Sequence, residues 1–435
     1  MATEPTYRAT GCCGGNAVRN AADDVPTAPT VQRGGATPQR MIVTADSYQA
    51  NVSLIAPTEG DARFIAGSPA ITTEPRRGIP GAVARLAWQC GYALSEEMTS
   101  AVIVAGPPVR LHVVGERGVD DVAALAIVEQ FGIARVVAET VAPAGHRTRD
   151  RSWHQSLTDA WRDGRIEALL IIVPPGALPL WATQLLTTLN ETASSGEVRC
   201  LVLASDADLA AALPPNTIFI PRGEHIAPQL TTALNRIRAA RFLYRIQEEM
   251  PLLSRPEALA AALRAVSAAR GRPAIYLDAA DGTTALVADE TGAAIYHDPD
   301  IDCARGAIRL LNQCEPEHIT RWIPFATGAN SLRTWALRRI SWPMALLTDE
   351  EDRAIAAAFA RVAIRQVLGK ALARIPDGAL WILGPTLARL GSSAMALRFV
   401  ADLMPSIPVA VVACDSDDLL STIGALAVPY PADAS

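Results

Sequence analysis

The segment AIYLDAADGTTALV, residues 274–287, has the residue types and spacing of a phosphate-binding turn. Its apolar stretch predicts a strand that ends at Asp278, and the turn that follows contains Gly282, Thr283 and Thr284. A carboxylate at a strand end can hold hydrated Mg²⁺ or orient an attacking water. Glycine lets backbone N–H groups curl towards a phosphate, and threonine hydroxyls add donors. The same residues would also close an ordinary β-hairpin, in which an aspartate accepts hydrogen bonds from its own turn.

A second aspartate stands in a related context near the start of the chain. The segment MIVTADSYQANVSLIAPTEGDARFIA predicts a strand that ends at Asp46, followed by a turn, a strand, an acidic turn and another strand. AIYLDAADGTTALVADETGAAIY has the same order of features. We therefore interpret the two segments as an internal repeat. Asp46 and Asp278 are the candidate catalytic carboxylates, and Asp278 is also the candidate metal ligand.

The elements that position these aspartates alternate between short apolar runs and helical patterns, which is typical of layered α/β proteins. In the first part of the chain, strands are predicted at 41–46, 51–55, 101–105, 109–114, 133–138, 168–173, 200–204 and 217–220. Helices are predicted at 79–91, 119–131, 150–163, 177–192, 205–212 and 224–249. The part from about 109 to 222 therefore has the pattern of a doubly wound unit.

The second part of the chain repeats the opening theme. After the helical segment RPEALAAALRAVSAAR come the hairpin, a long helix at 348–373, and two further strand–helix pairs, at 379–384 with 386–403 and at 409–414 with 416–427. The pattern predicts three parts. They are a disordered tail at 1–39, which has almost no large apolar residue, a first lobe at 40–250, and a second lobe at 251–435.

Composition and charge argue against some classes of partner and indicate a cellular compartment. The chain has 435 residues, of which 50% are hydrophobic and 19% charged, so it can bury more than one core. Its formal net charge is −6, and the dispersed basic residues argue against nucleic acid or membrane partners. Its seven cysteines lack zinc-ligand spacing, and no export signal or long apolar run is present, so we expect a cytoplasmic protein with reduced thiols. Cys12 and Cys13 form an adjacent pair of unassigned role.

Paired hairpins that each present an aspartate are how actin-like and Hsp70-like ATPases hold a nucleotide, and this sequence resembles that superfamily. It is most similar to the MutL-type accessory proteins of adenosylcobalamin-dependent glutamate mutase, over about residues 40–430. The resemblance is carried, in order, by ADSYQANVSLI, AIYLDAADGTTALV, RWIPF, EDRAIAAAFARVAIRQVL, WILGPTLA and DDLLSTIGALA. It implies an α/β actin-like fold of two ribonuclease-H-like lobes with an inserted doubly wound segment. It also implies ATP and Mg²⁺ as cofactors, with Gly384 at the adenosine-contacting turn and Gly282, Thr283 and Thr284 at the phosphate.

The turns depart from the family pattern. No glycine follows the first aspartate, and Tyr48 would obstruct a phosphate there. In the second hairpin the family's two adjacent glycines are replaced, and Asp281 adds a negative charge that repels a triphosphate. Pro385 follows Gly384 at the adenosine turn, and Pro174 occurs in an earlier turn, where the family has glycine; proline removes a backbone donor. Losses at several turns argue that nucleotide contact is weak or gone.

We therefore expect a degenerate MutL-like protein, a pseudo-ATPase that acts as a chaperone-like or scaffolding partner. The expected partner is a cobalamin-dependent mutase subunit or another protein complex. Two alternatives stay open on the sequence. One is a working Mg²⁺-dependent ATPase that reactivates a mutase, and the other is an actin-like structural protein that self-assembles.

Overall fold

The fold was taken from a computed structural model of the 435-residue chain. The structure describes residues 40–45, 49–58, 61–71, 75–90, 99–104, 108–115, 123–140, 150–163, 165–174, 178–192, 200–205, 207–214, 217–223, 225–240, 251–279, 282–341, 347, 349–370, 375, 378–390, 393–403 and 411–427. The predicted tail at 1–39, with Cys12 and Cys13, lies outside these ranges.

The first sheet is built by residues near the start of the chain and one strand from its middle. Its strand order is β10-β4-β1-β2-β3. The bounds are Arg40–Ala45 for β1, Gln49–Thr58 for β2, Asp61–Ile71 for β3, Thr99–Val104 for β4 and Leu252–Ser254 for β10. The first three strands form an antiparallel meander, whereas β4 pairs parallel with β1 and β10 pairs parallel with β4. The three-residue β10 was not predicted from the sequence.

The second sheet repeats this arrangement. Its order is β13-β12-β11-β14-β15. The bounds are Ala274–Asp278 for β11, Thr283–Asp289 for β12, Gly292–Asp298 for β13, Leu380–Leu383 for β14 and Val411–Cys414 for β15. Here too the first three strands are antiparallel, and β14 and β15 continue the sheet in parallel from β11. The shared order, 3-2-1-4-5 in each sheet, is that of a ribonuclease-H-like lobe, and it confirms the predicted repeat and the two-lobed α/β fold class.

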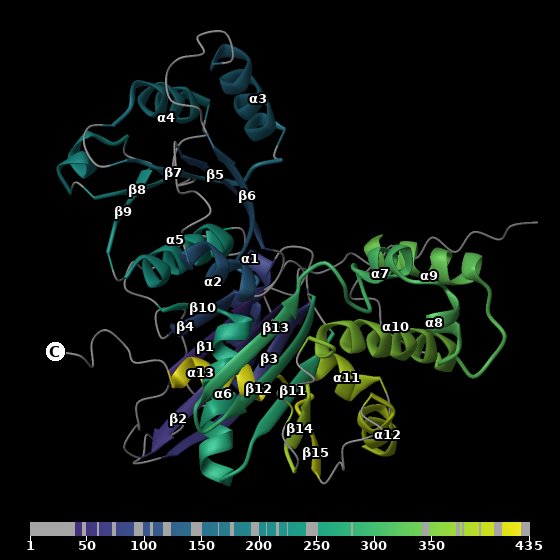
Figure 1. The fold of residues 1–435 in the computed structure, drawn as a ribbon. Coiled ribbons are helices and arrows are strands. Elements are labelled where there is room, and N and C mark those ends of the chain that lie inside the picture. Colours follow the sequence, from purple (N-terminus) through teal and green to yellow (C-terminus); the bar gives the residue numbers. More distant parts are fainter. Residues whose placement is uncertain are drawn as a thin grey trace, which may run out of the picture.

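A third sheet lies between β4 and β10 in the chain. It contains β5 (Val109–Gly115), β6 (Ala134–Thr140), β7 (Ala168–Ile172), β8 (Cys200–Ala204) and β9 (Thr217–Pro221). All of its pairings are parallel, in the order β6-β5-β7-β8-β9. This is the 2-1-3-4-5 order of doubly wound sheets. The predicted doubly wound insertion is thereby confirmed, and Figure 1 shows its sheet as a separate unit, above the other two sheets in this view.

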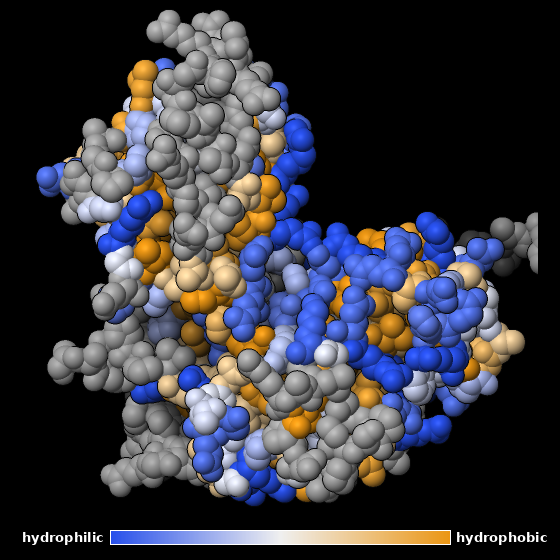
Figure 2. All heavy atoms as spheres, in the orientation of Figure 1, coloured by the Kyte–Doolittle hydropathy of each residue, from blue (hydrophilic) through white to orange (hydrophobic). Residues whose placement is uncertain are grey.

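The helices cover these sheets. They are α1 (Pro75–Cys90), α2 (Ala123–Gln130), α3 (Asp150–Arg162), α4 (Leu180–Thr192), α5 (Ile226–Ala240), α6 (Arg255–Arg270), α7 (Ala307–Gln313), α8 (Glu317–Thr320), α9 (Ala329–Ser341), α10 (Glu350–Leu368), α11 (Pro385–Arg389), α12 (Ser393–Leu403) and α13 (Leu419–Leu426), with the 3₁₀ helix η2 at Ala207–Ala212. The largest cluster of buried side chains joins α10 to the second sheet. On the face shown in Figure 2, the α7–α10 region carries mainly hydrophilic side chains, with smaller hydrophobic patches between them.

Helices α6 and α13 cross where the two lobes meet. Helix α6 packs against the second sheet, and Ala258 of α6 and Ala425 of α13 share a buried cluster with Ile42 and Ile103 of the first sheet. At the crossing there is no room for a side chain, because a Cβ on Gly424 would lie 1.7 Å from the carbonyl oxygen of Ala258. The backbones of the two helices are therefore in direct contact.

The remaining differences from the sequence predictions concern helices. Helices α7, α8 and α9 were not predicted. The helix predicted at 386–403 is two helices, α11 and α12, and the segment predicted at 205–212 is the 3₁₀ helix η2. The predicted lobe boundaries, 40–250 and 251–435, stay predictions. Within the described ranges, no helix combines the length and apolar character that a bilayer crossing requires.

Candidate functional site

Asp278 stands at the carboxyl end of the central strand of the second sheet. Strand β11 is fully buried and continues into a turn, which brings Asp278 beside the start of α11. The residue is only 1% exposed, and its Oδ1 accepts a hydrogen bond from the backbone N–H of Thr386 at 3.2 Å. The sequence prediction thus placed this carboxylate correctly at a strand end, in the position where a cation would be expected.

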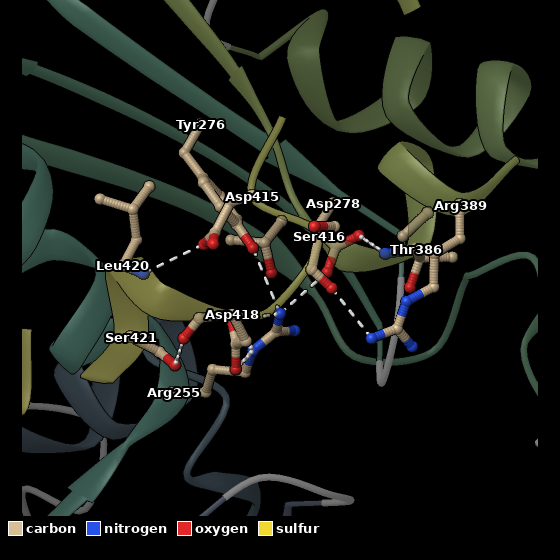
Figure 3. A network of polar contacts seen from close by, with 12 residues as sticks. Arg255, Tyr276, Asp278, Thr386, Arg389, Asp415, Ser416, Asp418, Leu420 and Ser421 are labelled. Atoms are coloured by element: carbon tan, nitrogen blue, oxygen red, sulfur yellow. Dashed lines mark hydrogen bonds and ion pairs between the residues drawn. The ribbon is translucent and has the colours of Figure 1, made fainter. Parts of the chain in front are cut away.

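An arginine side chain of the same chain occupies that position. Arg255 donates from Nη2 to Asp278 Oδ2 at 3.0 Å, to Asp418 Oδ1 at 3.0 Å and to the hydroxyl of Tyr276 at 3.2 Å. Its Nε donates to both carboxylate oxygens of Asp418 at 3.3 Å. Figure 3 shows the guanidinium pointing between the two carboxylates. Arg255 is the first residue of α6, and a capping box between Ser254 and Glu257 fixes that helix start.

Asp415 and Asp418 lie on the other side of this network. Asp415 follows β15, and its carboxylate accepts hydrogen bonds from the backbone N–H groups of Leu419 at 2.7 Å and Leu420 at 3.1 Å. Asp418 has a left-handed backbone, with φ of 57°, which turns the chain into α13. The network therefore ties the start of α6, the end of β11 and the start of α13 together.

Burial and ion pairing act on the carboxylates of this network in opposite directions. Burial raises the pKa of Asp278 above its usual range, although Arg255 acts in the opposite direction. Burial also raises the pKa of Asp415 to about 6, and Asp418 adds to that shift. Burial alone would lower the pKa of Arg255, but Asp418, Tyr276 and Asp278 outweigh it, so its pKa lies well above the ordinary value. Arg255 thus stays charged, and its single positive charge is shared between Asp278 and Asp418.

Gly384 contributes space to the same network. A Cβ on this residue would lie 2.2 Å from the hydroxyl oxygen of Tyr276 and 2.6 Å from the carboxyl carbon of Asp278. Its N–H donates to the carbonyl oxygen of Leu277 at 2.8 Å. The glycine predicted to contact adenosine therefore has a structural role of its own, because any side chain at this position would collide with the buried side chains of Tyr276 and Asp278. Its adenosine contact stays a prediction.

The hairpin turn predicted to bind phosphate uses its donors within the chain. The N–H of Gly282 donates to Asp302 Oδ2 at 3.2 Å, and the Thr283 hydroxyl donates to the carbonyl oxygen of Ile301 at 2.7 Å. The Thr284 hydroxyl is hydrogen-bonded to Nδ1 of His297 at 2.9 Å. Thr283 is fully buried and Thr284 is 5% exposed. Gly282 has φ of 94°, and a Cβ there would lie 2.7 Å from Pro299 Cα, so only glycine fits.

The carboxylate of Asp302 takes the place of an anion in this turn. Besides Gly282 it accepts from the backbone N–H groups of Ala304 at 2.6 Å and Gly306 at 2.7 Å. The donors of Ala304 and Gly306 follow Asp302 in the chain, as in an Asx turn, whereas Gly282 belongs to the hairpin turn that was predicted to bind phosphate. In this turn the anion is the carboxylate of Asp302, just as the cation beside Asp278 is the guanidinium of Arg255.

The inserted doubly wound unit lies against the same hairpin. Gln130, at the end of α2, donates from Nε2 to the carbonyl oxygen of Ile295 at 3.3 Å, and Arg135 of β6 pairs with Asp300. Gly132 faces His297, since a Cβ on it would lie 2.5 Å from the imidazole ring. His297 is thus held between the hairpin and the insertion, and burial lowers its pKa to about 4.

We expect this histidine to make folding sensitive to acid. Because its pKa is about 4 in the folded protein against 6.5 for a free imidazole, the unfolded chain binds the proton first as pH falls. The contribution of the neutral His297 to the free energy of unfolding is complete above pH 6.5 and is lost as pH falls from 6.5 to 4. The loss is up to about 3 kcal/mol. Urea unfolding across this pH range should therefore show a smaller acid loss for His297→Asn than for the wild type. His318→Asn, on α8, is the control, and an equal loss in wild type and His297→Asn would contradict the prediction.

Several residues of this site were not predicted from the sequence. Asp46 and Asp281 lie outside the described residues, so their predicted roles are untested. Arg255, Asp302 and Asp418 were missed, because each is remote in sequence from its partner: Asp278 for Arg255, Gly282 for Asp302 and Arg255 for Asp418. The one local signal was the capping-box pattern Ser-Arg-Pro-Glu at 254–257, which predicts where α6 begins but not where the arginine side chain points. Within the described ranges, no group of three or more metal-ligating side chains is present.

Comparison with known proteins finds solved structures of low sequence identity and low TM-score. No family model and no curated protein matches the sequence. Among solved structures, the ethanolamine utilization protein EutJ from Carboxydothermus hydrogenoformans is 12% identical, with 90% of this chain and 89% of that chain covered and a TM-score of 0.31. The PPX-GPPA enzyme of Aquifex aeolicus is 10% identical, with 89% and 90% covered and a TM-score of 0.26. The fold class therefore rests on the strand order of the sheets.

Proposed function

We propose that this protein is a degenerate MutL-like member of the actin-like fold class, which works as a chaperone-like or scaffolding partner and binds nucleotide weakly or not at all. The partner is a cobalamin-dependent mutase subunit or another protein complex. The sequence resemblance supports the mutase part of this proposal, and the internal bonding of the second hairpin supports the loss of nucleotide binding.

One observation carries the proposal. The groups that would hold a Mg²⁺-nucleotide are already bonded to residues of the chain: Asp278 to Arg255, and the donors of the Gly282 turn to Asp302 and its neighbours. A nucleotide would have to displace buried, charge-assisted hydrogen bonds, each of which contributes about 1.5–3 kcal/mol. It would also have to expel a guanidinium from between two carboxylates before a metal ion could enter.

We therefore expect no saturable heat when Mg²⁺ and ATP, or Mg²⁺ and ADP, are titrated into the protein in a calorimeter. The Asp278→Ala variant should give the same flat response, and so should Asp159→Ala, which removes an aspartate of α3 whose side chain is 43% exposed. Low-micromolar binding of Mg²⁺ and ATP by the wild type that disappears in Asp278→Ala, but not in Asp159→Ala, would contradict the proposal. That result would favour the active ATPase.

The partner is tested separately. We expect the protein to co-elute with adenosylcobalamin-dependent glutamate mutase in size-exclusion chromatography with light scattering, without added nucleotide. Alone, it should give a constant mass over a wide range of concentrations. The absence of a complex at micromolar concentrations would contradict the mutase partner, and a mass that grows with concentration would favour the self-assembling alternative.

A further inference from the structure

We infer that the second lobe carries a binding site for a phosphate group, formed by α8, α10 and α12 and distinct from the hairpin. Its basic residues are Arg321 after α8, Arg361 and Arg365 on α10, and Arg398 on α12, and three of these guanidiniums gather around the ring of Trp322. None of the elements of the network around Asp278 takes part. The inference therefore does not depend on the proposed function.

The guanidiniums are concentrated on one aromatic ring. The Cζ atoms of Arg321, Arg361 and Arg365 lie 5.2, 5.4 and 5.8 Å from the centroid of Trp322. Arg361 also lies 5.1 Å from the ring centroid of Phe399, on α12. The faces of aromatic rings attract cations, so the rings hold the arginines in place without neutralising their charge.

The positive charge in this cluster exceeds the negative charge. Among the described residues, Asp402 on α12 is the carboxylate that contacts this cluster, at 3.5 Å from Nη2 of Arg361 and 3.7 Å from Nε of Arg398. Both distances are long for a strong hydrogen bond. Over the ranges that the structure describes, Arg321 and Arg365 have no ion pair. Since Arg361 and Arg365 are four residues apart on one helix, their charges repel each other.

A buried donor without an acceptor points to a missing ligand. Arg361 is only 8% exposed, and its Nε is buried with no hydrogen-bond partner among the described residues. The indole Nε1 of Trp322 is likewise buried and unpartnered there. Burying an unpaired polar group is costly, and most such groups in folded proteins find a partner. An oxyanion at the cluster would supply acceptors where the chain leaves donors.

The chemistry favours a phosphate group over a carboxylate. Guanidiniums are planar forks that bind the oxygens of phosphate in pairs. A phosphate monoester carries a charge of about −1.5 to −2 near neutral pH and three acceptor oxygens, so it can serve several arginines at once. A second carboxylate would add only one negative charge, as Asp402 does, and would leave most of the excess positive charge of the arginines in place. Arg365 is exposed and the Arg398 side chain is 79% exposed, so both can rotate towards a ligand.

Inorganic phosphate is the probe for this site. At constant ionic strength, we expect saturable binding of inorganic phosphate in isothermal titration and a higher Tm in phosphate than in chloride. The double variant Arg365→Gln/Arg398→Gln should bind phosphate at least about tenfold more weakly, because it loses two charge-assisted contacts. Both side chains are exposed, so this variant should fold. Arg353→Gln, which removes an exposed arginine from the same helix α10, is the matched control and should bind as the wild type does.

A second variant separates this site from the hairpin. Thr284→Val removes a hydroxyl of the hairpin turn and should leave phosphate binding unchanged. Comparison of free O-phosphoserine with a phosphoserine peptide then tells whether a small phosphoester or a modified protein is the preferred source of the group. The inference is overturned if phosphate and chloride have equal effects, or if Arg365→Gln/Arg398→Gln binds phosphate as tightly as Arg353→Gln.

Discussion

Replacing Arg255 with methionine is expected to lower the free energy of unfolding by about 3–5 kcal/mol, the usual cost of breaking a buried ion pair by removing one partner. The Arg255 side chain is 13% exposed and lies between Asp278, 1% exposed, and Asp418, 12% exposed. Methionine fills a similar volume but leaves both carboxylates buried without their cation. Urea unfolding at neutral pH measures the loss.

Two further variants make this prediction specific. Arg264→Met removes an exposed arginine from the same helix α6 and should change stability little. Asp418→Asn removes one carboxylate but keeps a residue type that accepts the left-handed backbone at this position. In a double-mutant cycle, Arg255→Met and Asp418→Asn should be strongly coupled. Equal stabilities of Arg255→Met and Arg264→Met would show that the ion pair does not stabilise the site.

Replacing Gly424 with alanine is expected to cost about 3 kcal/mol or more, at the upper end of the range for overpacked cores. Its Cβ would lie 1.7 Å from the carbonyl oxygen of Ala258 and 2.5 Å from the carbonyl carbon, both of which are backbone atoms. A flexible side chain could move aside, but here α6 and α13 would have to separate. The change should appear as a lower midpoint in urea.

The matched control for this variant is Gly81→Ala, also within a helix. A Cβ on Gly81 would have its nearest neighbour, Nη1 of Arg85, at 3.7 Å, so alanine fits there. The intrinsic preference of helices for alanine should then stabilise Gly81→Ala by up to about 1 kcal/mol. If Gly424→Ala lowers the free energy of unfolding and Gly81→Ala raises it, the helix crossing is the cause of the destabilisation. A stabilised Gly424→Ala would contradict the close contact.

The repeat could be predicted because its signals are local. In both halves, apolar runs of strand length are interrupted by short polar turns, and the predicted strands at 274–296 match β11, β12 and β13 closely. Strands β7 and β8 of the insertion, ALLII and CLVLA, are continuous apolar runs because they are buried on both faces. Strand β10 was missed because three residues, Leu252–Ser254, are too few to show a period.

The state of the candidate site could not be predicted in this way. Sequence showed that glycines had been lost from the turns, but not that the remaining donors were already bonded. Asp302 and Asp418 lie 20 and 140 residues or so after the hairpin turn, and only the tertiary fold brings them to Gly282 and Arg255. The gap at 280–281 also leaves part of that turn outside the described residues.

The guanidinium at the end of β11 belongs to the same polymer as the acids that it neutralises, so its local concentration is set by folding. Its effective concentration at the carboxylates therefore does not depend on the concentration of free magnesium. A ligand drives a conformational change only through its different affinity for two shapes. Because Arg255 already supplies the positive charge at the end of β11, a metal-bound nucleotide has no charge to add there. Under the proposed function, a movement of one lobe against the other would then be driven by a partner protein that binds both lobes, and not by nucleotide.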